Sequence, residues 1–437
     1  MHIVIIGFGI SGVSVAKTLR EQSNADITIV TSESRSFFSR PALMYVYLGK
    51  MRFQDILPMP SDYWEKNNIK VVLAAVEDID SDKQQVVLDD GSVLYYDKLV
   101  IATGSVPRSL GLNEGNIGGV QGFYSLQDLL LLQKSAKNIR HAGIIGGGLI
   151  GVELAEMFLS TGISFTFWIR EKWFGSNFLP EEEAQLVTNY LKSKKIDIRF
   201  EREITHFDAN ELGQVTSLHS QIGERVDTDY VCVCIGVKPN INCLENTNIH
   251  TNHGVLVNAC LQTNIPSIYA VGDCVEYAEP SFGRKSVETL WYTGKRMGEY
   301  VGRNILLDHP QRYHQGIFFN SAKFFDLEYQ IYGHVPVSPE ENYGSVFWKH
   351  PQKDKSIRLV YDTVSDEFLG CCVLGIRFRQ QVCEKWIAEK WKITEVLHAL
   401  PTANFDSEFS TRFEMELLNI YNNKTQHMKL RALARDL

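Results

Sequence analysis

The sequence predicts an α/β fold built on parallel sheets, and three observations support this prediction. Apolar runs of strand length are followed by segments with helical periodicity. The order of strand, glycine-rich loop and helix occurs near the N-terminus and is repeated more than a hundred residues later. The length of 437 residues exceeds that of one ordinary core, so we expect more than one domain.

The first glycine loop follows an apolar run, residues 2–6, and precedes a helical pattern. In such a loop the first glycine permits a tight turn, the second admits a diphosphate, and the third lets helix pack on strand. A second strand is expected over 26–30, and Glu33 lies 21 residues beyond Gly12, where an acid can bind ribose hydroxyls. The loop residues predicted to hold a dinucleotide are Gly7, Gly9, Ile10, Ser11 and Gly12.

The second glycine loop has the same surroundings. An apolar run, 142–145, precedes it, and a helix over 152–162 and a strand over 163–169 follow. Two dinucleotide folds imply two dinucleotides, and the economical pairing is a tightly held FAD with an exchangeable NAD(P)H. The loop residues are Gly146, Gly148, Leu149, Ile150 and Gly151.

Three further motifs occur in order after these loops or between them. They are "YYDKLVIATGSVPR" at 95–108, "CIGVKPN" at 234–240 and "IYAVGDCVE" at 268–276. With the two loops they resemble the flavoproteins that carry two dinucleotide-binding domains, the pyridine nucleotide-disulfide oxidoreductase superfamily. An apolar strand at 267–271 would also bring Asp273 to the carboxyl end of a sheet, where ligands bind. The alternative for Asp273 is a cap on the next helix.

The resemblance implies two Rossmann-like dinucleotide-binding domains, one inserted in the other, with three-layer ββα character. The FAD-binding domain would comprise 1–118 and 242–308, and the NAD(P)-binding domain 119–241. Residues 309–437 would form an α+β C-terminal domain. Its segments 318–333 and 368–375 are similar to the interface domain of ferredoxin and rubredoxin reductases and of apoptosis-inducing-factor-like proteins.

The resemblance also assigns site residues. Beyond the first loop, the FAD positions are Glu33, Arg40, Pro41, Val76, Ala102, Thr103, Gly104, Asp273, Thr289, Leu290 and Trp291. Beyond the second loop, the NAD(P) positions are Glu153, Arg170 and Gly236. A helix expected over 287–304 would face the flavin with its start, and Trp291 would contact the flavin there, with a core position as the alternative. Phe324 and Phe325 would shield the flavin from the C-terminal domain, again with a core position as the alternative.

A redox-active cysteine is missing from the stretch 36–49, where Pro41 takes its place, and no cysteine precedes Cys232. Thiol chemistry beside the flavin is therefore not expected. Arg40 and Pro41 instead match an R-P-x-L motif of the ferredoxin-reductase class. Tyr45 stands where that class often has a lysine, which puts its pairing with Glu153 in doubt. Glu153 would lie in the flavin and nicotinamide environment or serve as a first-turn helix residue.

The choice between NADH and NADPH stays open. Arg170 follows the second strand of the inserted domain and favours a 2′-phosphate, whereas Glu171 could bind a 2′-hydroxyl. We therefore expect NAD(P)H without naming one form.

Composition excludes other classes. A net charge of −8 argues against nucleic-acid binding, and no apolar run is long enough to form a transmembrane segment. The cysteine spacings fit no zinc motif, and no metal site is predicted. The N-terminal run lacks a basic leader, so we expect a cytoplasmic setting. The basic tail, 424–435, is either a solvated helix or a contact for a membrane surface or an acidic partner.

The sequence therefore predicts an FAD-dependent NAD(P)H oxidoreductase that passes electrons to a separate acceptor, such as a rubredoxin or ferredoxin. An acidic ferredoxin would need a local basic patch formed by Arg377, Arg379, Lys385 and Lys390. A nitrite-reductase-type or quinone-reducing NADH dehydrogenase flavoprotein is one alternative. A flavin redox sensor or assembly protein similar to apoptosis-inducing factor is another, and a homodimer is possible.

Overall fold

The computed structural model describes residues 1–112, 114–406 and 413–435, with side chains as far as residue 424. The chain forms two compact units, each assembled from separated segments. Unit 1 contains Met1–Gly146, Met157–Phe165 and Ile204–Gln315, and unit 2 contains Gly147–Glu156, Thr166–Glu203 and Gly316–Leu437. The three predicted domain boundaries stay a prediction. The side chains of most of the basic tail lie outside the described residues.

The main sheet of unit 1 is parallel throughout, with strand order β19-β7-β1-β2-β3. Its strands are β1 (His2–Ile6), β2 (Asp26–Thr31), β3 (Ile69–Leu73), β7 (Lys98–Ile101) and β19 (Ile268–Ala270). The chain builds the sheet outward from β1 on one side and then continues with β7 on the other side. Strand order therefore reverses beside β1, which is the position where open α/β sheets bind ligands.

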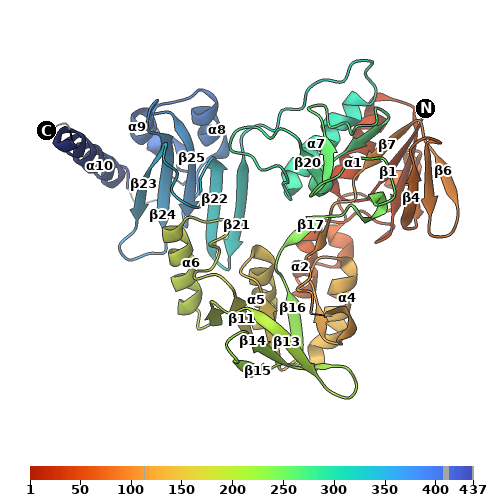
Figure 1. Ribbon diagram of the computed structural model, residues 1–437, viewed down its shortest axis with the longest axis horizontal. Coiled ribbons are helices and arrows are strands. Elements are labelled where there is room, and N and C mark those ends of the chain that lie inside the picture. The colour runs from red at the N-terminus through yellow and green to blue at the C-terminus, as the bar shows by residue number, and fades with distance from the viewer. Residues whose placement is uncertain (113, 407–412, 436–437) are drawn as a thin grey trace. The chain divides into compact units, whose positions relative to one another are not determined.

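Helix α1 (Ile10–Gln22) packs closely on α7 (Trp291–Asn304), and Figure 1 shows the two side by side. Three glycines spaced four apart on α7 make this possible. A Cβ at Gly294 would lie 2.5 Å from Ser11 Oγ, and one at Gly298 would lie 2.3 Å from the Ser11 carbonyl oxygen. The predicted start of this helix at residue 287 is wrong, because α7 begins at Trp291 after an extended Leu290.

Smaller sheets complete unit 1. An antiparallel layer of β4 (Val76–Asp80), β5 (Gln85–Leu88) and β6 (Val93–Tyr95) matches the predicted ββα character. Strands β9 (Val120–Gln121), β10 (His141–Ile145) and β16 (Tyr230–Val233) pair in parallel. An antiparallel set consists of β13 (Ile204–Ala209), β14 (Val215–Ser220) and β15 (Arg225–Asp227). The short strands β18 (Val255–Val257) and β20 (Val275–Tyr277) also pair in parallel.

Unit 2 has a parallel and an antiparallel part. Strand β11 (Ser164–Ile169), most of which belongs to this unit, pairs in parallel with β12 (Asp197–Phe200). The C-terminal sheet is antiparallel in the order β21-β22-β25-β24-β23. Its strands are β21 (Phe319–Phe324), β22 (Leu327–Gly333), β23 (Tyr343–Lys349), β24 (Ser356–Asp362) and β25 (Phe368–Leu374). The predicted α/β and α+β fold class is thus confirmed.

The remaining helices have clear bounds. Helix α5 (Leu149–Thr161) follows the second glycine loop, and α4 (Leu126–Ser135) precedes β10. Figure 1 shows α8 (Gln380–Ala388) and α9 (Ile393–Ala403) beside the C-terminal sheet, and α10 (Glu414–Arg435) contacts β23. Short helices are α2 (Leu43–Tyr47) and α3 (Tyr63–Lys66), and α6 spans Glu181–Ser193. Among the described residues, no helix is both long and apolar enough to cross a bilayer.

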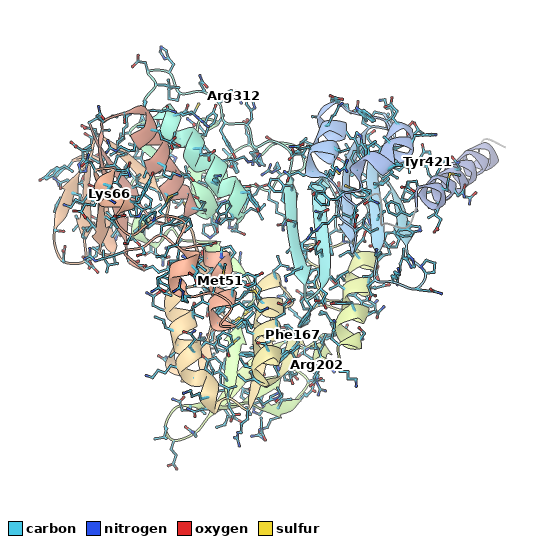
Figure 2. The ribbon with its side chains drawn as sticks, turned by 180° about the vertical axis from the view of Figure 1, so that it is seen from behind. Met51, Lys66, Phe167, Arg202, Arg312 and Tyr421 are labelled. Atoms are coloured by element: carbon cyan, nitrogen blue, oxygen red, sulfur yellow. The ribbon has the colours of Figure 1, made fainter. Side chains whose placement is uncertain are left out.

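Inside unit 2, a buried ion pair joins α6 to the C-terminal sheet, and an aromatic cluster joins β11 and the segment after it to the same sheet. The Arg358 guanidinium donates to the Glu183 carboxylate at 2.7 and 2.9 Å, and both residues are buried. Phe324 packs edge-on against Phe174 at 5.9 Å between ring centroids, and Phe174 packs on Phe167, labelled in Figure 2. Phe324 is fully buried in this cluster, so its predicted role as a flavin shield is wrong.

Candidate functional site

The first glycine loop admits only glycine at two of its three positions. Gly7 has φ +116°, and a Cβ there would lie 2.0 Å from the Ala102 carbonyl oxygen. A Cβ at Gly12 would lie 2.2 Å from the carbonyl oxygen of Gly7. The first and third glycines are therefore required by the packing of β1, β7 and α1.

Gly9 is different, because a Cβ there would meet no atom within 4 Å. Gly9 is exposed and forms the N-cap of α1, with no side chain capping the helix and no acidic residue in its first turn. Unpaired N–H groups and the helix dipole at such a terminus attract an anion. The open backbone at Gly9 fits the diphosphate of a dinucleotide, as the glycine spacing predicted.

The predicted FAD positions gather at the carboxyl ends of the parallel strands of unit 1. Gly7 follows β1, Glu33 lies two residues beyond β2, Ala102 follows β7, and Asp273 lies three residues beyond β19. Val76 begins β4, is half-buried and packs against the unit 1 core. Parallel strands bring their carboxyl ends to one edge, so residues distant in sequence share this edge.

Glu33 is held by Arg40 in a two-point ion pair. The guanidinium of Arg40 donates to the two Glu33 carboxylate oxygens at 2.9 and 2.5 Å, and the Leu126 N–H donates to Oε1 at 2.9 Å. Arg40 also donates to the Tyr124 carbonyl oxygen at 2.7 Å. The two Arg40 nitrogens and the Leu126 N–H fill three of the acceptor positions of the Glu33 carboxylate. One acceptor position on Oε2 is left, and it could take a ribose hydroxyl. Pro41 occupies the short helical turn Arg40–Ala42.

Asp273 is positioned by a hydroxyl from a neighbouring strand end. Ser105 Oγ donates to Asp273 Oδ2 at 2.8 Å, and the same Oγ lies 2.9 Å from the Tyr124 hydroxyl. Burial raises the pKa of Asp273, while the Ser105 hydrogen bond and the positive charge of Arg40 oppose this rise. The alternative helix-cap role finds no support, because Asp273 lies in a short 3-10 turn followed by β20.

Two motifs that the sequence presented separately pair with each other. Strand β8 (Ser105–Pro107) runs antiparallel to β17 (Val237–Pro239). The Thr103 hydroxyl donates to the Asn240 carbonyl oxygen at 2.6 Å, and the Asn240 N–H donates to the Gly104 carbonyl oxygen at 2.9 Å. Gly104 and Gly236 have φ +69° and +99°. Both predicted glycines thus shape the ends of one connecting ribbon.

The second glycine loop repeats part of this geometry. Gly146 has φ +115°, and a Cβ there would lie 2.3 Å from the Cys234 carbonyl oxygen. In unit 2, a Cβ at Gly147 would lie 3.4 Å from the side chain of Ile169, at the end of β11. Leu149, Ile150 and Gly151 form the first turn of α5, after Gly148. The loop therefore begins, as the first does, with a glycine pressed against a neighbouring strand end.

Glu153 lies in the second turn of α5 and is half-buried. Burial, with a smaller contribution from the Glu156 carboxylate, raises the pKa of Glu153 to about 7. A carboxyl group with this pKa can hold or release a proton near neutral pH. The predicted loss of a lysine partner for Glu153, inferred from Tyr45, stays a prediction.

Arg170 follows β11 and its side chain is 74% exposed. One guanidinium nitrogen lies 3.3 Å from Glu171 Oε1. Arg170, expected to favour NADPH, and Glu171, expected to favour NADH, are therefore in contact with each other. Both residues follow the end of β11, and the NADH or NADPH preference stays open.

The start of α7 is exposed. Thr289 is exposed, Leu290 is half-buried, and Trp291 is 37% exposed with its ring packed edge-on against Tyr292. The core alternative for Trp291 is thus wrong. Its predicted contact with the flavin stays a prediction.

The sequence reasoning missed a buried ion pair just before α7. Arg284 Nε donates to Glu288 Oε1 at 2.6 Å, and each side chain is 2% exposed. Arg284 also donates to the Gln315 carbonyl oxygen at 2.7 Å. The pair anchors the segment that leads into Thr289 and Trp291. Its i,i+4 spacing was visible in the sequence, but nothing there indicated burial.

Two cysteines close to these motifs, Cys274 and Cys243, are poor nucleophiles. Cys274 follows Asp273 and is fully buried, and burial raises its pKa. Burial also raises the pKa of Cys243 to about 11. Neither thiol would be ionised near neutral pH, which agrees with the absence of a cysteine at position 41.

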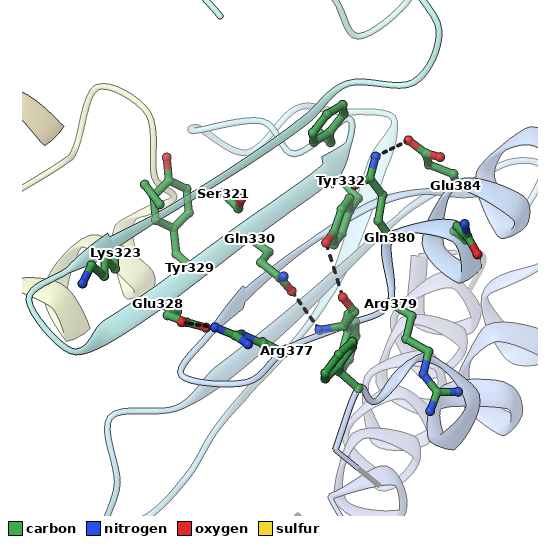
Figure 3. Close-up of a pocket in the computed structure, with 15 residues that line it drawn as sticks. Ser321, Lys323, Glu328, Tyr329, Gln330, Tyr332, Arg377, Arg379, Gln380 and Glu384 are labelled. Carbon is green, nitrogen blue, oxygen red and sulfur yellow. Dashed lines mark hydrogen bonds and ion pairs between the residues drawn. The ribbon is translucent and has the colours of Figure 1, made fainter. Parts of the chain in front are cut away.

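The hypothesised basic patch in the C-terminal region is not supported. Arg377 Nε donates to Glu328 Oε2 at 2.6 Å, Lys390 lies 3.5 Å from Glu367, and Lys385 lies 4.0 Å from Glu389. Figure 3 shows Arg377 and Arg379 lining a groove of about 910 Å³ between β22 and α8. Because acids neutralise most of these cations, the patch lacks a strong positive field.

Known proteins resemble this chain in sequence and structure. An assimilatory nitrate reductase electron transfer subunit of Bacillus subtilis is 29% identical over 303 residues, covering 69% of this chain and 39% of that protein. The chain thus spans about two fifths of the length of this relative. An NADH-rubredoxin oxidoreductase of Clostridium acetobutylicum is 29% identical over 303 residues, covering 69% of this chain and 74% of that protein.

The solved structure of NADH:rubredoxin oxidoreductase from Clostridium acetobutylicum has a TM-score of 0.72 at 25% identity. The superposition covers 97% of this chain and 99% of that one. A family model, described as pyridine nucleotide-disulphide oxidoreductase, matches residues 1–298, which include both glycine loops and Asp273. The chain belongs to the pyridine nucleotide-disulphide oxidoreductase family.

Proposed function

We propose that this chain is an FAD-dependent NAD(P)H oxidoreductase that passes electrons to a separate redox carrier. The observation that carries the proposal is the first glycine loop. Gly7 and Gly12 are packed against backbone, while Gly9 leaves open space at the uncapped start of α1. This arrangement suits the diphosphate of FAD. Bound FAD would supply hydride and single-electron chemistry.

The residues of unit 1 would hold the FAD. The free acceptor position on Glu33 Oε2 would bind a ribose hydroxyl, and Arg40 would keep the Glu33 carboxylate in place. Asp273 would accept a hydrogen bond from the flavin side chain through Oδ1, since Ser105 occupies Oδ2. The N-terminal turn of α7 would contact the flavin ring through Thr289, Leu290 and Trp291.

The second loop would bind the nicotinamide dinucleotide. Gly146, Gly148 and Gly151 would surround its diphosphate, and Arg170 or Glu171 would read the 2′ position of the ribose. Glu153, with a pKa raised to about 7, would hold a proton near the reacting ring. These residues orient the partners, and orientation is the main contribution that a protein makes to hydride transfer.

The acceptor we favour is a small redox carrier such as a rubredoxin or ferredoxin. The similarity to a rubredoxin oxidoreductase over 97% of the chain supports this choice. A second candidate is electron delivery to a nitrate- or nitrite-reducing partner, favoured by the match to the Bacillus subtilis electron transfer subunit. A homodimer and a cytoplasmic setting stay predictions.

Three measurements on the purified chain test the proposal. The protein should contain about one FAD, and NADH or NADPH should bleach it within seconds under anaerobic conditions. Steady-state turnover should then be measured with rubredoxin, ferredoxin, nitrite reductase, quinone, oxygen and disulfide as acceptors. A carrier protein should be reduced at least tenfold faster than a disulfide. A chain that binds no FAD would overturn the proposal, and very slow bleaching would favour the redox-sensor alternative.

A further inference from the structure

A cluster of metal-binding side chains lies on the small antiparallel sheet of unit 1, apart from both glycine loops. His206 of β13 lies directly opposite His219 of β14 in the strand register. Asp208 lies two residues beyond His206 along β13 and opposite Ser217. Because strand side chains alternate between faces, His206, Asp208 and His219 project from the same face.

The donor atoms of these three side chains are close together. Their ligand atoms all lie within 4.8 Å of one another. The His219 Nε2 lies 2.7 Å from Asp208 Oδ2, and the two imidazole rings stack with centroids 3.9 Å apart and planes 17° apart. Donors that share one zinc ion at bond lengths of about 2.0–2.1 Å lie roughly 3.3 Å apart. The cluster therefore needs only side-chain rotation to close on an ion.

The surroundings leave room for that rotation. His206 is exposed, and Asp208 and His219 are half-buried, so the rings can splay without disturbing the core. All three residues lie on paired strands, and the register of β13 shifts just before His206 and just after Asp208. A fourth position facing solvent would be open to water.

The donor set selects the class of ion. Two imidazole nitrogens and one carboxylate oxygen suit zinc and its neighbours in the first transition series, whereas magnesium and calcium prefer oxygen ligands alone. We propose that His206, Asp208 and His219 form a binding site for a divalent transition metal, with Zn²⁺ as the expected occupant. This inference goes beyond the oxidoreductase function and differs from the sequence analysis, which predicted no metal site.

Of the side chains next to Asp208, Ser217 orients its carboxylate, and Arg225 competes with a metal ion for it. The Ser217 hydroxyl donates to Asp208 Oδ2 at 2.6 Å, which orients the carboxylate. The Arg225 Nε lies 3.5 Å from the same Oδ2, while its Nη2 lies 2.9 Å from Asp227. Arg225 therefore opposes a cation but can stay bound to Asp227.

Metal titration of the FAD-loaded full chain, after treatment with a chelator, tests the site. Isothermal titration calorimetry with ZnCl₂ at pH 7.5 should show one tight site in the wild type. The variants His206→Asn, His219→Asn and Asp208→Asn should each weaken binding at least tenfold, as loss of a ligand usually does. His253→Asn, at an exposed histidine of the same unit, is the matched control and should bind as the wild type does.

Two further measurements separate a metal site from a surface hydrogen-bond cluster. Arg225→Gln should tighten Zn²⁺ binding, because it removes a competing positive charge. The electron paramagnetic resonance spectrum of bound Cu²⁺ should show coupling to two imidazole nitrogens in the wild type and to fewer in His219→Asn. Equal zinc affinity in the wild type and the three ligand variants, at unchanged circular dichroism and FAD content, would overturn the proposal.

Discussion

The two glycine loops have the same spacing but different neighbours. Both begin with a glycine at a φ near +115°, and in both a Cβ would strike the carbonyl oxygen of a neighbouring strand end, Ala102 or Cys234. They differ two residues after the third glycine, where the first loop has Ser14 and the second has Glu153. Ser14 is packed against α7, since a Cβ at Gly298 would lie 2.8 Å from its Cβ.

This difference teaches how one motif can serve two roles. Helix α1, which follows the first loop, packs closely against α7, and only small side chains fit at that contact. Glu33 of the first site is also fixed by Arg40, whereas Arg170 of the second site is 74% exposed. A tightly held ligand suits the first environment, and an exchangeable ligand suits the second. Four substitutions test this contrast.

The largest effect is expected for Gly7→Ala. The new Cβ would lie 2.0 Å from a backbone oxygen, and φ +116° is strained for any residue with a Cβ. We expect a loss of about 3 kcal/mol or more in the free energy of unfolding, or no folded protein. Urea unfolding followed by circular dichroism measures this. A Gly7→Ala variant as stable as the wild type would show that the loop is looser than described.

Gly9→Val should instead fold but lose FAD. Its Cβ meets no protein atom within 4 Å, and φ −78° is ordinary for valine, so stability of the polypeptide should change little. The side chain would occupy the space of the diphosphate. We expect FAD content, measured by absorbance near 450 nm, to fall at least tenfold.

Gly115→Val is the matched control for Gly9→Val. A Cβ at Gly115 also meets no atom within 4 Å, and this glycine lies outside both loops. Its FAD content should equal that of the wild type. A similar loss of FAD in both variants would contradict the proposal that the diphosphate of FAD lies at Gly9.

Glu153→Gln should stabilise the chain in a pH-dependent way. The raised pKa means that the folded chain favours the neutral carboxyl group, so stability is lost as pH rises from 4.5 to about 7. Glutamine is neutral at every pH, so the variant should exceed the wild type above pH 7 and match it below pH 4.5. One pKa unit corresponds to about 1.36 kcal/mol, so the gain at pH 8.5 has an upper limit of about 3 kcal/mol.

Thermal unfolding at pH 5 and pH 8.5 measures this effect. Glu156→Gln should produce a smaller gain, because it removes only the secondary cause of the raised pKa. A difference between Glu153→Gln and the wild type that stays constant with pH would contradict the assignment.

The smallest effect on stability is expected for Arg170→Glu, because exposed side chains contribute little. Its effect should fall on nucleotide choice. We expect flavin reduction by NADPH to slow about tenfold relative to reduction by NADH, since the 2′-phosphate loses a cation and meets an added acid. Stopped-flow reduction with both nucleotides checks this. Equal changes with the two would show that Arg170 does not read the 2′ position.

Local patterns predicted much of the fold and the glycine loops. The strand at His2–Ile6 is confirmed at its predicted bounds, and the strand predicted over 26–30 is confirmed with one added residue, Thr31. The reason is physical: a buried parallel strand needs a continuous apolar run, and a tight turn against another strand needs glycine. These requirements act within a few residues and can be read directly.

Contacts between segments far apart in the chain could not be predicted from local sequence patterns. The bond from Ser105 to Asp273 spans 168 residues, and the pairing of Glu33 with Leu126 spans 93. The buried Arg284–Glu288 pair precedes the start of α7 at Trp291, and Phe324 lies in an aromatic cluster with Phe174.

The His206, Asp208 and His219 cluster depends in the same way on the register of one hairpin. Sequence alone determined the family motifs and the two dinucleotide loops. Only the tertiary structure decided which side chains meet, because strand order and register bring them together.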